Sequence, residues 1–180
     1  HVVKVLCFYH PDDSDDMKTA QEDTVKRLFA AARRNRLERL LEVIPSKVGP
    51  VDDSTTGKII QRFYDIGVYP DWWKLEPLKT DAAWLDATTA ITRNDPNTRG
   101  IVVLGLDAPA QELFDSFATA AKFPLVRGFA VGRTIFGDVA KRWLAGRVTD
   151  AEAVAEMQKN YADMCRVWDQ ARADARGKAA

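Results

Sequence analysis

Three charged side chains interrupt short apolar runs of this chain: Lys4 in residues 2–9, Glu42 in residues 40–44 and Lys74 in residues 72–75. An ammonium group is costly to bury, so a lysine in such a run is either paired with a carboxylate or neutral. A neutral amine can attack a carbonyl group and form an imine. The setting of Lys74 therefore makes it a candidate for imine chemistry.

Each of these side chains also has a structural interpretation. Strand alternation places Lys74 on one face with Trp72 and Glu76, so Lys74 can form an ion pair with Glu76 or with another carboxylate. Glu42 can act as a general acid/base or as the structural partner of a lysine, and both interpretations hold if that lysine is Lys74. Lys4 can bind a substrate hydroxyl or phosphate, or lie exposed on a frayed chain end.

The segment after the apolar run at residues 126–131 has the features of a phosphate-binding site. Gly132 and Arg133 follow this run, and we expect a helix that begins near Asp138. Glycine lets backbone N–H groups approach an anion, a helix N-terminus adds its dipole, and arginine supplies a charged donor. Gly105, at the end of the apolar run at residues 101–106, and Asp107, directly after that run, are expected to form the other half of this site.

Short apolar runs alternate with longer segments of helical periodicity along the whole chain. This alternation is typical of a parallel sheet packed against helices, and the repeat of about 30 residues is that of a barrel of about 250 residues divided by eight. A doubly wound open sheet alternates in the same way, although no G-x-G-x-x-G turn follows any strand. The expected strands are residues 2–9, 40–44, 72–75, 101–106 and 126–131, and the expected helices are residues 15–35, 55–66, 81–93, 111–122, 138–144 and 151–172.

The composition limits the class of protein. With 46% hydrophobic and 29% charged residues, the chain has the profile of a globular domain, and we expect one domain over residues 1–180. Twenty-six basic and 26 acidic residues cancel, so no overall field attracts nucleic acid or an anionic membrane. The two cysteines and two histidines have neither disulfide nor metal-ligand spacing, so we expect a cytoplasmic protein without a metal or cofactor. His1 directly before a strand suggests that the chain begins inside a larger protein.

Four motifs follow one another along the chain: KVLCFYHPDD at residues 4–13, LEVIP at 41–45, DWWKLE at 71–76 and FAVGRTIF at 129–136. Together they resemble class I aldolases of the tagatose-bisphosphate aldolase type. The resemblance is greatest to the aldolase-like domain (DUF2090) fused behind the sugar kinase of bacterial myo-inositol catabolism, 5-dehydro-2-deoxygluconokinase. It extends over nearly the whole chain.

The resemblance implies a (β/α)8 TIM barrel to which this chain contributes the fourth to the eighth strands. It implies that Lys74 forms the imine, that Glu42 is the acid/base, that Lys4 is the fourth-strand lysine, and that Gly132 and Arg133 bind phosphate. The implied reaction cleaves 5-dehydro-2-deoxygluconate 6-phosphate to dihydroxyacetone phosphate and malonate semialdehyde.

An arc of five strands leaves two sheet edges and an inner face open. We therefore expect a longer protein or self-association that covers the edges, with a phosphorylated sugar as substrate and a fused or associated sugar kinase as partner. One alternative is a non-catalytic barrel domain that binds a sugar phosphate and regulates the kinase. Another is a phosphosugar isomerase or epimerase that uses Glu42 as base without a covalent adduct. These hypotheses differ at Lys74, which only the aldolase needs for turnover.

Overall fold

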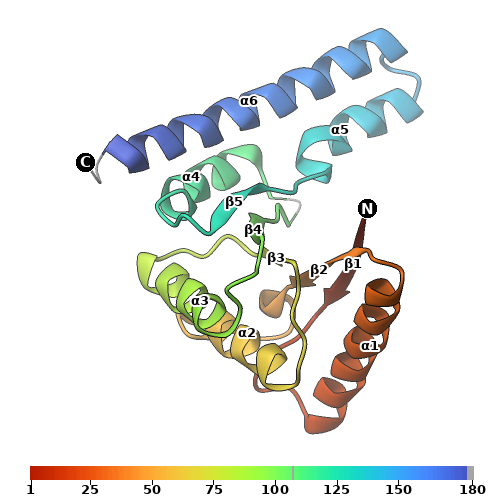
Figure 1. Cartoon of the computed structure of the whole chain (residues 1–180). Helices are drawn as coiled ribbons and strands as arrows, with labels where there is room; N and C mark the ends of the chain where they lie inside the picture. The colour runs from red at the N-terminus through yellow and green to blue at the C-terminus, as the bar shows by residue number, and fades with distance from the viewer. Residues whose placement is uncertain (107, 178–180) are drawn as a thin grey trace.

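The protein folds into one parallel β-sheet with helices packed against it (Figure 1). The computed structural model describes residues 1–106 and 108–177. The strands lie side by side in the order in which they occur along the chain, which is the order of a barrel. In a doubly wound sheet the strand order reverses at one point of the sheet. This order decides between the two folds that the periodicity leaves open. The strands are β1 (Val2–Cys7), β2 (Glu38–Val43), β3 (Trp72–Leu75), β4 (Gly100–Val103) and β5 (Val126–Phe129).

The alternation of strand and helix predicted from the sequence is confirmed, but the position of the fifth helix is wrong. α5 begins at Arg133 and not near Asp138, because the Gly132 carbonyl accepts hydrogen bonds from the backbone N–H groups of Ile135 and Phe136, at 2.8 and 3.2 Å. Arg133 is therefore a helical residue. The helices are α1 (Asp15–Arg34), the 3-10 helix η1 (Pro45–Lys47), α2 (Thr55–Asp65), α3 (Asp81–Asn94), α4 (Ala110–Ala120), α5 (Arg133–Leu144) and α6 (Asp150–Gly177).

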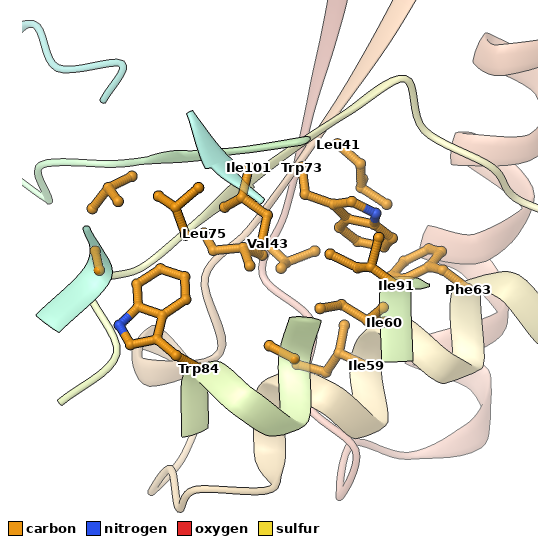
Figure 2. Close-up of a cluster of buried hydrophobic side chains, with 14 of the residues drawn as sticks. Leu41, Val43, Ile59, Ile60, Phe63, Trp73, Leu75, Trp84, Ile91 and Ile101 are labelled. Carbon is orange, nitrogen blue, oxygen red and sulfur yellow. The ribbon is translucent and has the colours of Figure 1, made fainter. Parts of the chain in front are cut away.

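One face of the sheet forms the hydrophobic core with the helices. In β3, Trp73 and Leu75 are completely buried, and the intervening Lys74 points to the opposite face, as the alternation of a strand requires. Apolar side chains of α2 and α3 fill the space over these strands (Figure 2). The same cluster includes Leu41, Val43, Ile59, Ile60, Phe63, Trp84, Ile91 and Ile101.

Trp73 is one of two tryptophans that are fully buried in this core, and replacing it by alanine is expected to lower the free energy of unfolding by about 3–5 kcal/mol. The indole contacts the Phe63 ring and donates a hydrogen bond of 3.0 Å to the Tyr64 hydroxyl, so truncation leaves a cavity and an unpaired hydroxyl. Urea denaturation measures the change. The control Leu85→Ala, at a side chain that is 60% exposed on α3, should cost well under half as much; equal losses would contradict this account.

An ion pair between the buried Glu22 and the half-exposed Arg62 ties α1 to α2. Glu22 is 3% exposed and accepts hydrogen bonds from the Arg62 guanidinium at 2.8 and 2.9 Å and from the Tyr9 hydroxyl at 2.7 Å. Burial by itself raises the pKa of Glu22, but the hydrogen bonds from Arg62 and Tyr9 outweigh burial and hold the pKa below its ordinary value. The carboxylate therefore stabilises the fold above the unfolded-state pKa of about 4.3, and this contribution disappears as pH falls through the lower folded-state pKa.

Substitution Glu22→Gln is expected to destabilise the protein by about 1–3 kcal/mol at pH 7, because a charged acceptor is lost from a buried network. The difference between variant and parent should shrink as the pH is lowered below 4, since the parent then loses the same charge. Urea denaturation at a series of pH values measures both effects. Asp23→Asn on the exposed side of α1 is the matched control and should show neither; a pH-independent loss in Glu22→Gln would contradict the linkage.

The other face of the sheet carries no helix in the described ranges. Leu6 and Phe8 extend from the β1 side of the sheet and are 39% and 51% exposed, while Lys4, Glu42 and Lys74 lie on the same face. In a barrel this face is the interior, and active sites lie at its carboxyl-terminal end. Lys4, Glu42 and Lys74 therefore lie on the face where the active site of a barrel is expected. Within residues 1–106 and 108–177, no helix is both long and apolar enough to cross a membrane.

Candidate active site

Lys4 and Lys74 both contact Glu42, and the three side chains come from three adjacent strands. The register pairs Leu6 of β1 with Glu42 of β2, and Glu42 with Lys74 of β3, so side chains of the same face meet. Glu42 Oε1 lies 3.0 Å from Lys74 Nζ, and Glu42 Oε2 lies 2.6 Å from Lys4 Nζ. The carboxylate thus bridges two ammonium groups. Of the two partners that the sequence allows for Lys74, the structure places Glu42 and not Glu76 beside it.

Burial differs sharply within this cluster. The side chain of Glu42 is 7% exposed, that of Lys74 is 16% exposed, and that of Lys4 is 49% exposed. Lys74 and Glu42 are therefore shielded from bulk water, whereas Lys4 reaches solvent. A carboxylate within hydrogen-bond distance of an amine can exchange a proton with it. The same contact satisfies the structural interpretation, because each charge also has a partner of opposite sign.

The cluster lies in the wall of a cavity of about 550 Å³ on the open face of the sheet. This volume is in the range of small-molecule sites. The wall is formed by residues of β1, β2 and β3, by the loop after β4, and by the segment from the end of β5 into α5. Its charged members among the described residues are Lys4, Glu42, Lys47, Lys74 and Arg133.

Gly105, Gly132 and Arg133 lie together in the part of the cavity wall between β4 and α5. A Cβ atom on Gly105 would lie 2.8 Å from Val131 Cγ1, so only glycine lets the end of β4 pack this closely on the β5 side. Gly132 precedes the first turn of α5, and no side chain in the described part of the chain caps this N-terminus. Backbone N–H groups at such a helix start can bind an anion. Asp107, the remaining predicted residue, lies outside the described residues.

Two contacts beside the cavity were not anticipated from the sequence. Glu76 is 7% exposed and accepts hydrogen bonds from Ser46, one from its backbone N–H at 3.2 Å and a second from its hydroxyl. These bonds fix the turn η1, which presents Lys47 to the cavity. Strand alternation predicts that Glu76 points to the same face as Lys74. That Ser46 is the partner of Glu76 could not be predicted, because Ser46 lies in the loop after β2.

A parallel sheet in barrel order, with a lysine and a glutamate in contact on its inner face, places the protein among aldolase-like barrel folds. The chain belongs to the family described as "Uncharacterized protein conserved in bacteria (DUF2090)", whose model matches residues 1–172. No curated protein matches the chain.

Among solved structures, the chain is similar to fructose-bisphosphate aldolase from Plasmodium falciparum, solved in complex with TRAP and a small-molecule inhibitor. The TM-score is 0.62 at 16% sequence identity, and the match covers 95% of this chain and 55% of the aldolase chain. The chain therefore spans about half the length of that aldolase. The aldolase-like fold and the DUF2090 family, both predicted from the motifs, are confirmed; the link to a kinase stays a prediction.

Proposed function

We propose that this chain carries the imine-forming site of a class I aldolase, a carbon–carbon lyase. The observation that supports it most directly is the 3.0 Å contact between Lys74 Nζ and Glu42 Oε1 in the cavity wall. An imine-forming amine needs a shielded position and a group that moves protons beside it. Lys74 and Glu42 have both properties.

In the proposed reaction, the deprotonated amine of Lys74 adds to the substrate ketone and water leaves, which gives an iminium ion. Glu42 then removes the proton from the hydroxyl group on the β-carbon. The bond between the α- and β-carbons breaks, its electron pair enters the iminium to form an enamine, and an aldehyde departs. Protonation of the enamine carbon and hydrolysis of the imine release the second product and restore Lys74.

The proposed substrate is 5-dehydro-2-deoxygluconate 6-phosphate, which would yield dihydroxyacetone phosphate and malonate semialdehyde in myo-inositol catabolism. Its phosphate is next to the ketone, so an imine on Lys74 would direct the phosphate to one side of the cavity. Gly132, Arg133 and Gly105 lie in the wall there and offer a helix N-terminus and a guanidinium group. Lys4 is close enough to Glu42 to hold a substrate hydroxyl beside the proton acceptor.

The partner proposed for this domain is a fused or associated sugar kinase, and the sheet edges at β1 and β5 are the proposed places of association. A barrel that only binds sugar phosphate would use the same Gly132 and Arg133 segment. Such a binding domain would not need an amine that reacts with carbonyl groups.

Borohydride trapping tests the proposal. The full-length natural protein is incubated with dihydroxyacetone phosphate, reduced with borohydride and digested, and the peptides are examined by mass spectrometry. A reduced adduct on Lys74 is expected. If no lysine of the protein carries an adduct, the covalent mechanism is wrong, and the sugar-phosphate-binding domain becomes the better account. Enediol proton exchange without an adduct would favour an isomerase or epimerase.

A further inference from the structure

The outer side of α1, which faces away from the sheet, has a regular pattern of charged and small residues. Val25, in the middle of α1, is fully buried and marks the side of the helix that faces the core. An α-helix turns by about 100° per residue, so the residues within about 40° of the direction opposite Val25 can be identified from their numbers. We call them the α1 stripe, and all of them are exposed: Asp16, Ala20, Asp23, Arg27, Ala30 and Arg34.

The two halves of the α1 stripe carry opposite charges. Asp16 and Asp23 lie in its first half, and Arg27 and Arg34 lie in its second half. Within residues 1–106 and 108–177, none of these four side chains forms an ion pair, whereas the buried Glu22 of the same helix pairs with Arg62. The α1 stripe therefore presents two carboxylates and two guanidinium groups that the described residues do not neutralise.

The pattern is symmetric about Val25. Each aspartate is as far from Val25 along the chain in one direction as an arginine is in the other, and the two alanines are related in the same way. The symmetric pairs are Asp16 with Arg34, Ala20 with Ala30, and Asp23 with Arg27. A two-fold axis beside Val25 would place the α1 helix of a second copy antiparallel to the first, and each residue would then lie opposite its counterpart. Every aspartate of the stripe would face an arginine of the other copy.

The opposite orientation of two such helices is unfavourable. A parallel arrangement in the same register would bring Asp23 against Asp23 and Arg27 against Arg27, and like charges in contact across an interface are repulsive. The charges therefore favour one relative orientation of two copies and disfavour the other.

The shape of the surface also suits a second helix. α1 lies at one side of the molecule (Figure 1), and its outer side has a shallow hollow that is lined by α1 residues alone, among them Arg27, Ala30 and Arg34. The small side chain of Ala30 leaves space between the two arginines. Where side chains are small, two helices can pack with their axes about 8 Å apart, the lower end of the usual range.

A helix without a partner accounts for only part of the pattern. An aspartate in the first turn and an arginine in the last turn complement the helix dipole, which explains Asp16 and Arg34. Asp23 and Arg27 lie in the middle of α1, where the dipole has little effect. Residues four apart can pair along one helix, but the structure does not pair these two.

We propose that α1 is a self-association surface, on which α1 of a second copy of this chain packs antiparallel about a two-fold axis beside Val25. One pair of helices buries less than the roughly 1,200–2,000 Å² of a stable interface, so we expect a dissociation constant in the micromolar range. The ion pairs lie at the surface, so salt should weaken the dimer. The surface is separate from the cavity that contains Lys74, and the proposal therefore does not depend on the imine chemistry.

Charge reversal at the centre of the α1 stripe tests the proposal. Asp23→Arg leaves only positive charges at the centre of the interface, and Arg27→Glu leaves only negative ones. Each variant alone is expected to associate about 10- to 100-fold more weakly than the parent, because ion pairs are replaced by repulsive contacts. An equimolar mixture of the two should associate again, since the introduced arginine of one variant faces the introduced glutamate of the other. Sedimentation equilibrium of the full-length natural protein and its variants measures these constants.

Two controls accompany this experiment. Arg93→Glu makes the same change of charge at an exposed arginine of α3 and should leave the association unchanged. Urea denaturation of each single variant checks that the monomer stays folded. For the parent, raising the salt from about 0.1 M to about 1 M shortens the screening length from about 10 Å to about 3 Å and should weaken association.

The outcomes separate an α1 dimer from the other possibilities. Weak association of both single variants together with recovery in their mixture supports the antiparallel register, because only contacts between copies can be restored by mixing. A parent protein that stays monomeric at high concentration and low salt overturns the proposal. Single variants that associate like the parent, or a mixture that associates no better than its components, overturn it as well.

Discussion

Replacing Lys74 by arginine is expected to abolish the borohydride adduct and to lower retro-aldol turnover by more than about 10³-fold. The guanidinium group keeps the positive charge beside Glu42, so the ion pair of the cluster survives in altered form. It cannot lose its proton at neutral pH and cannot form an imine. Trapping with dihydroxyacetone phosphate and a cleavage assay with 5-dehydro-2-deoxygluconate 6-phosphate measure the two effects.

Lys4→Arg is the matched control for this substitution. Lys4 contacts the same carboxylate as Lys74 and lines the same cavity, but its side chain is 49% exposed. The variant should retain the adduct on Lys74, because Lys4 does not form the imine, and should lose less turnover than Lys74→Arg. An adduct that persists in Lys74→Arg, on Lys4 or on Lys47, would show that Lys74 is not the reactive amine. Unchanged turnover of Lys74→Arg would favour the structural interpretation of the cluster.

The arrangement of Lys74 could be predicted from the sequence because strand alternation is a local rule. A charged residue between Trp73 and Leu75 must face away from the core if those two face it, and both are completely buried. Strand alternation alone could not identify the partner of Lys74. Whether Glu42 or Glu76 lies beside it depends on the register between β2 and β3, which long-range packing determines.

The start of α5 shows a second limit of sequence reasoning. Gly132 and Gly137 flank the first turn, and glycine is a poor helix former, so periodicity predicts a later start, near Asp138. In the structure the Gly132 carbonyl begins the helix, and packing of Ile135 and Val139 against the protein outweighs the low propensity of Gly137. The position of Arg133 as a helical residue could not be derived from local preference.

Lys47 was not predicted for a related reason. In the sequence it is a polar residue after a strand, like many loop lysines. Its position in the cavity depends on the bonds from Ser46 to Glu76, which join residues 30 positions apart. Contacts of this kind become visible only when the loops of neighbouring strands are placed side by side.

Glu42→Gln is expected to reduce turnover by about 10²–10⁴-fold, the contribution of a positioned general acid/base. The amide has the same shape but cannot accept the proton of the substrate hydroxyl. Lys74 stays in place, so an adduct should still accumulate during long incubation with dihydroxyacetone phosphate, although more slowly. Loss of turnover with retention of trapping would therefore separate the role of Glu42 from that of Lys74. Single-turnover cleavage and trapping at timed intervals measure the two.

Glu38→Gln is the control that the chain offers for this substitution. Glu38 lies on β2 on the same face as Glu42. It forms an ion pair with Arg99 at 2.9 Å and accepts a hydrogen bond from the Trp72 indole. It is absent from the cavity wall, so its loss should change turnover by less than about threefold. Because each variant removes one carboxylate from a contact with a cation, their stabilities can be compared by urea denaturation. If both variants lose turnover in proportion to stability, Glu42 acts through the fold; if only Glu42→Gln loses turnover beyond its stability change, Glu42 acts on the substrate.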